Sequence, residues 1–120
     1  MIVAFAFMAF AAVSMFLDYK TTVESNALDI GEANPRYQNA DGSANVRKLV
    51  FDKFLLFGIC AGLSFALYFS GLDFTPFPRE IAFALFLGVA LRHFIVWRQN
   101  AKNIRLRKEK LDRETNGVNL

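Results

Sequence analysis

Three long apolar runs dominate the pattern of hydrophobic and polar positions along this chain. They cover residues 1–17, 49–69 and 81–97 and contain few charged side chains. A helix needs about 20 apolar residues to cross the hydrocarbon core of a bilayer, with a lower limit near 17. The runs therefore predict an all-α integral membrane protein with three transmembrane helices, built as a single membrane domain over residues 1–120.

Polar positions predict where the first two helices end. In the first helix, polar side chains recur three or four residues apart and so share one face: Ser14, Asp18, Thr22, Ser25 and Asp29. We expect this helix to cover about residues 2–30, with Gly31 as its stop. Residues 31–46 are rich in Asn, Gly, Asp and Ser and predict a loop. A second helix is expected over about residues 47–70.

The third helix is expected to continue well beyond its apolar run. Its start falls near Pro78, since proline is tolerated in the first turn of a helix. Residues 99–114 have high helix propensity, and no breaker precedes Gly117. We therefore expect one helix over about residues 78–113 that extends into the cytoplasm beyond residue 98.

The charge distribution predicts the orientation. The formal net charge is +3, but the basic residues concentrate after the last apolar run. Such a tail could bind nucleic acid, but directly after a membrane helix it favours the anionic inner face of a membrane. This places the C-terminus in the cytoplasm and the N-terminus outside, with no nucleic-acid partner. The side chains expected to contact lipid headgroups or a partner are Arg98, Lys102, Arg105, Arg107 and Lys108.

A layer of charge is expected inside the inner leaflet. At 1.5 Å per residue, antiparallel helices bring four ionisable side chains to one depth: Asp18, Lys53, Arg92 and His93. Ionisable groups within a membrane tend to pair or to face a cavity. The alternatives are snorkelling to the headgroups, a structural ion pair, or a proton or ligand site. Among ion pairs we favour Asp18 with Arg92.

Small residues form two stripes at helical spacing. The first stripe lies on helix two and the second on helix three: Gly58, Gly62, Ala66 and Ser70, then Ala84 and Gly88. Such stripes allow close approach of helix backbones in lipid. We favour packing within the chain, and docking of a partner chain is the alternative.

Two short motifs support a family resemblance. Asp18 and Thr22 form a D-x-x-x-T pattern, and residues 31–35 form a G-E-x-N-P pattern. With two further spans, the chain resembles a family of small prokaryotic integral membrane proteins of unknown function over most of residues 15–100. It departs from that pattern by a longer polar insertion before the second span. The resemblance implies a prokaryotic inner-membrane location and a turn cluster that caps the first helix: Thr22, Glu32, Asn34 and Pro35.

The sequence contains no recognisable catalytic motif, so we expect a non-enzymatic protein without a cofactor. Cys60 and His93 are the only residues of their kinds, and their spacing to the acids predicts no metal site. The favoured function is an accessory subunit within a larger membrane complex of respiratory, oxygenase or photosynthetic type. Its expected partners are other integral membrane subunits and anionic lipid headgroups. The alternative is a small transporter, channel or holin-like pore former, and a membrane enzyme has the least support.

Overall fold

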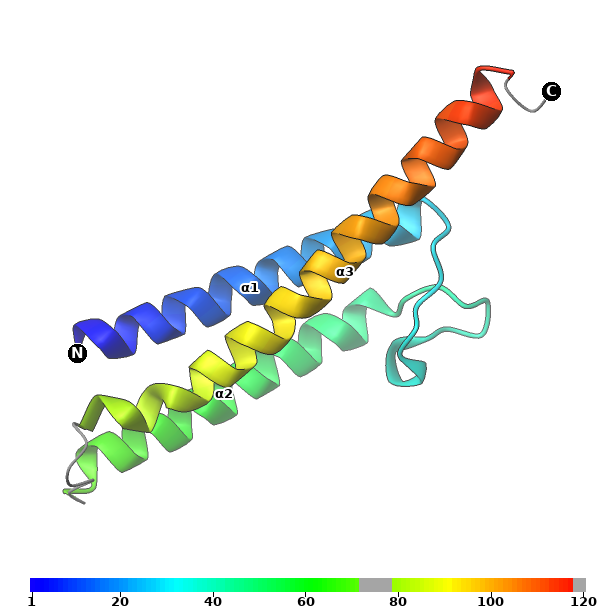
Figure 1. Cartoon of the computed structure of the whole chain (residues 1–120). Coiled ribbons are helices and arrows are strands. Elements are labelled where there is room, and N and C mark those ends of the chain that lie inside the picture. The colour runs from blue at the N-terminus through cyan, green and yellow to red at the C-terminus, as the bar shows by residue number, and fades with distance from the viewer. Residues whose placement is uncertain (72–78, 118–120) are drawn as a thin grey trace.

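Three long helices make up most of the protein. The structure, a computed structural model, describes residues 1–71 and 79–117. In chain order its elements are α1 (Ile2–Ala27), η1 (Pro35–Tyr37), α2 (Val46–Phe69), η2 (Arg79–Phe83) and α3 (Ala84–Thr115), where η marks a 3-10 helix. Helices α1 and α3 begin at the same end and run in the same direction, whereas α2 runs in the opposite direction (Figure 1).

The expected fold class is confirmed. All three helices are long and apolar enough to cross a membrane, so the fold is that of an all-α, multi-pass membrane protein. Helix α3 continues without a break to Thr115, and its C-terminal end projects beyond the other two helices (Figure 1). The expected start of this helix near Pro78 lies outside the described residues.

Helix α1 ends earlier than the sequence predicts. It ends at Ala27, and Asp29 adopts a left-handed conformation with φ of 55°. The backbone N–H of Ile30 then donates to the carbonyl of Ser25 at 2.9 Å, which is the long bond of a Schellman motif. Asp is one of the few side chains that tolerate this conformation. The expectation that Gly31 stops the helix is therefore wrong.

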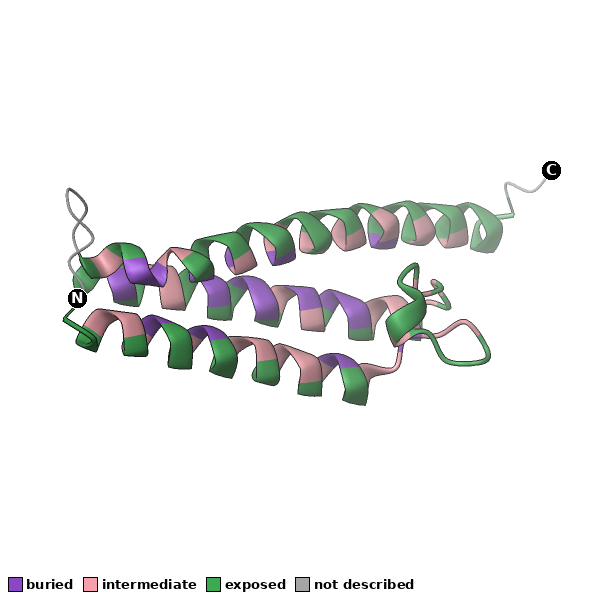
Figure 2. Ribbon diagram, turned by 90° about the horizontal axis from the view of Figure 1, so that it is seen from below, coloured by how far each residue is buried: buried purple, intermediate pink, exposed green. Residues whose placement is uncertain are grey.

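The packed core lies between the helices, mainly along α1 and α3. Alanines allow these helices to approach closely, and the buried ones are Ala4, Ala11, Ala82 and Ala90. Phe83 and Phe86 are fully buried beside them. Their rings contact the α2 rings of Phe65 at 5.1 Å and Phe57 at 5.0 Å between centroids. Figure 2 shows that the buried residues form inward stripes on otherwise exposed helices.

The small-residue stripe of α2 does not take part in this packing. Gly58, Gly62, Ala66 and Ser70 are all exposed. A Cβ added at Gly58 or Gly62 would meet no atom within 4 Å, and the same holds for Gly88 on α3. The stripe is thus not used between the described helices, where alanines take its place. Docking of a partner helix against it stays a prediction.

Candidate functional site

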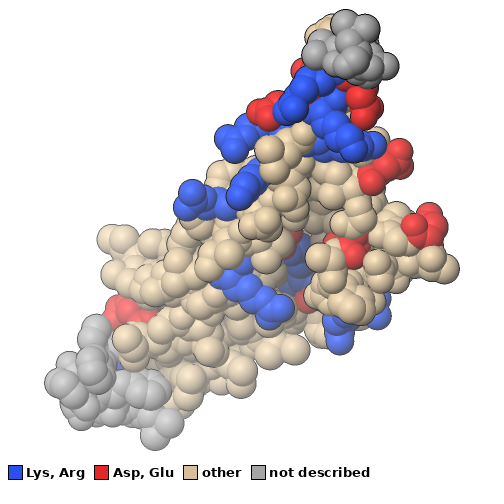
Figure 3. All heavy atoms as spheres, turned by 45° about the vertical axis from the view of Figure 1, so that its right-hand side comes forward, with Lys and Arg blue, Asp and Glu red and all other residues tan. Residues whose placement is uncertain are grey.

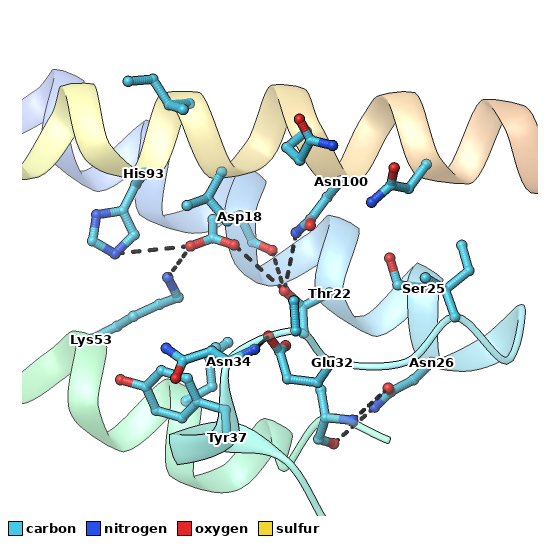
Figure 4. A pocket seen from close by; sticks show the side chains of 18 of the residues that line it. Asp18, Thr22, Ser25, Asn26, Glu32, Asn34, Tyr37, Lys53, His93 and Asn100 are labelled. Atoms are coloured by element: carbon cyan, nitrogen blue, oxygen red, sulfur yellow. Dashed lines mark hydrogen bonds and ion pairs between the residues drawn. The ribbon is translucent and has the colours of Figure 1, made fainter. Parts of the chain in front are cut away.

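Three ionisable side chains, one from each long helix, meet in the interior. Asp18 Oδ2 lies 2.6 Å from Lys53 Nζ and 3.9 Å from His93 Nε2. The three side chains are only 7–12% exposed. Figure 4 shows them pointing toward one another from α1, α2 and α3. The structure thus brings together Asp18, Lys53 and His93 of the expected charged layer.

The expected ion pair between Asp18 and Arg92 is wrong. Arg92 is exposed and forms no ion pair with any residue that the structure describes. Consecutive residues of a helix point about 100° apart. Because His93 faces the core, its neighbour Arg92 is turned outward, and Lys53 of α2 pairs with Asp18 instead.

The His93 ring is oriented by its own helix. Its Nδ1 lies 2.8 Å from the backbone carbonyl of Val89. A carbonyl only accepts hydrogen bonds, so Nδ1 carries a proton and the neutral ring presents the Nε2 lone pair to Asp18. The 3.9 Å between Nε2 and Asp18 Oδ2 is longer than a hydrogen bond, so His93 lies beside the carboxylate without a direct bond to it.

Hydroxyl and amide groups extend the polar cluster along α1 and α3. Thr22 lies one turn after Asp18 and donates from Oγ1 to the Asp18 carbonyl at 2.9 Å. Asn100 of α3 donates from Nδ2 to Thr21 Oγ1 at 3.2 Å. The D-x-x-x-T spacing thus gives α1 one continuous polar face. The side-chain amide of Asn100 on α3 hydrogen-bonds to this face.

The G-E-x-N-P turn caps a different helix from the one expected. Asn34 Oδ1 accepts the backbone N–H of Arg36 at 3.1 Å, and Glu32 Oε1 accepts that of Asn34 at 2.9 Å. Pro35 is the first residue of η1. These residues therefore start η1 rather than cap the end of α1, because the Schellman motif already satisfies that end.

The loop that contains η1 is tied to both neighbouring helices. Arg36 Nε and Tyr37 Oη donate to Asp52 Oδ2 of α2 at 2.8 and 2.9 Å. Asn26 of α1 donates to the Ala44 carbonyl and accepts from its N–H, both at 2.9 Å. Burial and the bond to Asp52 raise the pKa of the Tyr37 phenol, so it remains a donor at neutral pH. The loop thus forms an ordered cover over the ends of α1 and α2.

A polar cavity of about 440 Å³ lies beneath this cover. Its polar lining comes from the loop and all three helices and includes Asp18, Thr22, Asn26, Glu32, Asn34, Tyr37, Asp52, Lys53, Arg92, His93 and Asn100. This volume falls in the range of about 300–1,000 Å³ that is typical of small-molecule sites. Among the described residues, no three His, Cys, Asp or Glu side chains are grouped to hold a metal ion. The cavity therefore suits a polar organic group rather than a metal centre.

Several residues of this cavity were not predicted from the sequence. Asn26 follows Thr22 by four residues and Asn100 follows His93 by seven, so helical spacing carries a signal for both. Tyr37 carries no such signal, since its contact with Asp52 depends on the path of the loop.

The basic residues of α3 divide into two sets. Arg107 Nε donates to the carbonyl of Leu28 at 3.2 Å, and Lys108 Nζ pairs with Glu24 Oε1 at 2.8 Å. These two tie α3 to the end of α1. The second set is exposed and forms no ion pair with a described residue, and it includes Arg98, Lys102 and Arg105. Figure 3 shows basic side chains along the projecting end of the molecule and around a hollow in the middle of the same face.

No family model, curated protein or solved structure matches this chain. The resemblance to a family of small membrane proteins therefore stays a prediction that rests on two short motifs.

Proposed function

We propose that the protein is an accessory subunit of a larger integral membrane complex, with α2 docking against a helix of another subunit. The observation that carries this proposal is the outward stripe of Gly58, Gly62, Ala66 and Ser70. Apolar contact alone gives helices little reason to associate in lipid, so small residues that permit close backbone contact are what an interface needs. Helix α2 is also the least buried of the three candidate spans.

We further propose that the complex lies in a prokaryotic inner membrane, with the N-terminus outside and the C-terminus in the cytoplasm. Exposed basic residues that follow the apolar run of α3 support this orientation, and they include Arg98, Lys102 and Arg105. In that position they would contact anionic headgroups or a cytoplasmic surface of the partner.

The test is isolation of the full chain from native membranes in a mild detergent, with co-purifying proteins identified by mass spectrometry. We expect a stoichiometric integral membrane partner. Gly62→Leu should lower its recovery about tenfold, because a leucine holds the two helix backbones apart. Gly88→Leu is the matched control, since Gly88 is equally open but lies on α3. Equal recovery with both variants, or no partner at all, would refute the proposal.

A second candidate function is an independent proton or ion pathway, as in a small transporter or pore former. The buried cluster of Asp18, Lys53 and His93 favours it, because proton pathways use such groups within the membrane. Purified protein in liposomes would then conduct protons, and Asp18→Asn would abolish the flux. An absence of flux with the unmodified protein would rule this candidate out.

A further inference from the structure

A second, apolar cavity adjoins the polar one. It is a groove of about 770 Å³ between α2 and α3, with walls that include Leu67, Ile81, Leu85 and Gly88. Leu56 and Arg92 line both cavities, so the apolar groove and the polar cavity are adjacent at these two side chains. The combined space has an apolar section and a polar section in sequence, with a guanidinium where they meet.

The charges in the polar section are mostly paired within the chain. Asp18 pairs with Lys53, and Asp52 pairs with Arg36. Two lining residues of opposite charge, Arg92 and Glu32, form no ion pair among the described residues. Arg92 is at the junction with the apolar groove, and Glu32 is on the loop that covers the polar end. A ligand can therefore meet first a cation and then an anion along the path from the apolar to the polar section.

The apolar section has the length of one lipid leaflet. Along α3 and the end of η2, the path from Arg92 back to Ile81 covers about 16 Å at the rise of an α-helix. The hydrocarbon core of a bilayer is about 30 Å thick, so each leaflet accounts for about half of that. Arg92 lies five residues, or about 8 Å, inside the end of the apolar run 81–97, so an acyl chain that begins there and follows the groove to Ile81 would pass the middle of the membrane.

We infer that the two cavities together bind one phospholipid with a primary ammonium headgroup, phosphatidylethanolamine, from the leaflet nearest the covering loop. One acyl chain occupies the groove, the phosphate binds the Arg92 guanidinium, and the ammonium group pairs with Glu32. A guanidinium presents paired donors that match a phosphate, and a carboxylate accepts hydrogen bonds from an ammonium. This inference does not depend on the docking of a partner subunit.

Lipid selectivity of the purified full-length protein tests the inference. Binding of phosphatidylethanolamine, phosphatidylglycerol and phosphatidylcholine is measured in detergent by native mass spectrometry. We expect phosphatidylethanolamine to bind about tenfold more tightly than the other two, which cannot donate from an ammonium to Glu32. Equal binding of the three lipids would overturn the inference. The inference would also be overturned if soluble phosphoethanolamine displaced the bound lipid as well as phosphatidylethanolamine does. The apolar groove would then contribute nothing to binding.

Three substitutions assign the parts of the site. Arg92→Gln should weaken all three lipids about tenfold, and Glu32→Gln should remove the preference for phosphatidylethanolamine. Gly88→Leu should weaken binding by filling the groove, where nothing lies within 4 Å of its Cβ position. The controls are a charge and a glycine outside both cavities, namely Glu109→Gln and Gly62→Leu, which should bind lipid like the unmodified chain.

Circular dichroism would detect a folding defect in Arg92→Gln. In that case Arg92→Lys, which keeps the positive charge, is the variant whose lipid binding is measured. Lysine keeps the charge but lacks the paired donors, so we expect a smaller loss of about threefold for all three lipids. Unchanged binding in a folded Arg92 variant would overturn the role of Arg92, and with it the inference.

Discussion

At the scale of single residues, Asp18 is the one whose carboxylate most strongly constrains the packing of the interior. It is buried between the three long helices, where an unpaired charge is costly. Lys53 Nζ supplies the opposite charge 2.6 Å from Asp18 Oδ2, and His93 Nε2 lies 3.9 Å from the same oxygen. Removing one partner of such a buried ion pair destabilises the fold strongly, whereas replacing both partners with apolar side chains costs much less.

Lys53→Met should be strongly destabilising, because it leaves Asp18 buried without its cation. We expect a loss of about 3–5 kcal/mol in the free energy of unfolding. The double variant Asp18→Leu/Lys53→Met should recover most of that loss, since no buried charge then remains. Chemical unfolding in detergent micelles, arranged as a double-mutant cycle, measures both effects. Additive losses would show that the two side chains do not interact.

A substitution at Ser64 is expected to stabilise the protein rather than destabilise it. Its side chain is fully buried, and its Oγ has no hydrogen-bond partner among the described residues. An unsatisfied buried hydroxyl costs about 1–3 kcal/mol. Ser64→Ala should therefore raise the midpoint of thermal unfolding, measured by circular dichroism in detergent. A lower midpoint would mean that the hydroxyl is satisfied in solution.

At the scale of elements, the loop between α1 and α2 decides whether the polar cavity is covered. Asn26 holds it to α1 through two hydrogen bonds with Ala44, and Asp52 holds it to α2. The loop also carries its own tight turn, in which Asp41 accepts hydrogen bonds from the Oγ and N–H of Ser43. Asn26 and Asp41 each allow one of these sets of contacts to be tested by a single substitution.

Asn26→Ala should release the loop from α1 while the helices stay packed. Two lost hydrogen bonds amount to about 1–3 kcal/mol in local opening. Amide hydrogen exchange at Ala44 should therefore accelerate about tenfold or more. Exchange in the core of α3 serves as the internal control and should not change. Unaltered exchange at Ala44 would show that the loop is held by its other contacts.

The turn at Asp41 should loosen in acid. Hydrogen bonds from Ser43 lower the pKa of the Asp41 carboxyl below its usual value. A lowered pKa in the folded state means that the contribution to stability is present above the unfolded pKa and is lost as the pH falls through the folded one. The Ser43 amide resonance should therefore shift below about pH 4. Asp41→Asn should remove this step, and a step that persists would exclude Asp41 as its cause.

At the scale of the whole molecule, the proposed orientation in the membrane can be tested directly. Cys60 is the only cysteine, so Cys60→Ser gives a background for single-cysteine labelling. In intact cells, Lys110→Cys should resist a membrane-impermeant thiol reagent, whereas Arg79→Cys should react. The reverse result would place the basic end of α3 outside and invert the proposed orientation.

The sequence by itself determined the three spans, because the length and apolar character of a run are properties of consecutive residues. It also placed Asp18, Lys53 and His93 at one depth, since depth follows from the rise per residue. Only the tertiary structure decided that Lys53 rather than Arg92 pairs with Asp18, and that the glycine stripe of α2 faces outward. Both depend on how each helix is rotated about its own axis. That rotation is set by packing against the other helices, and a change of one residue moves a side chain by about 100°.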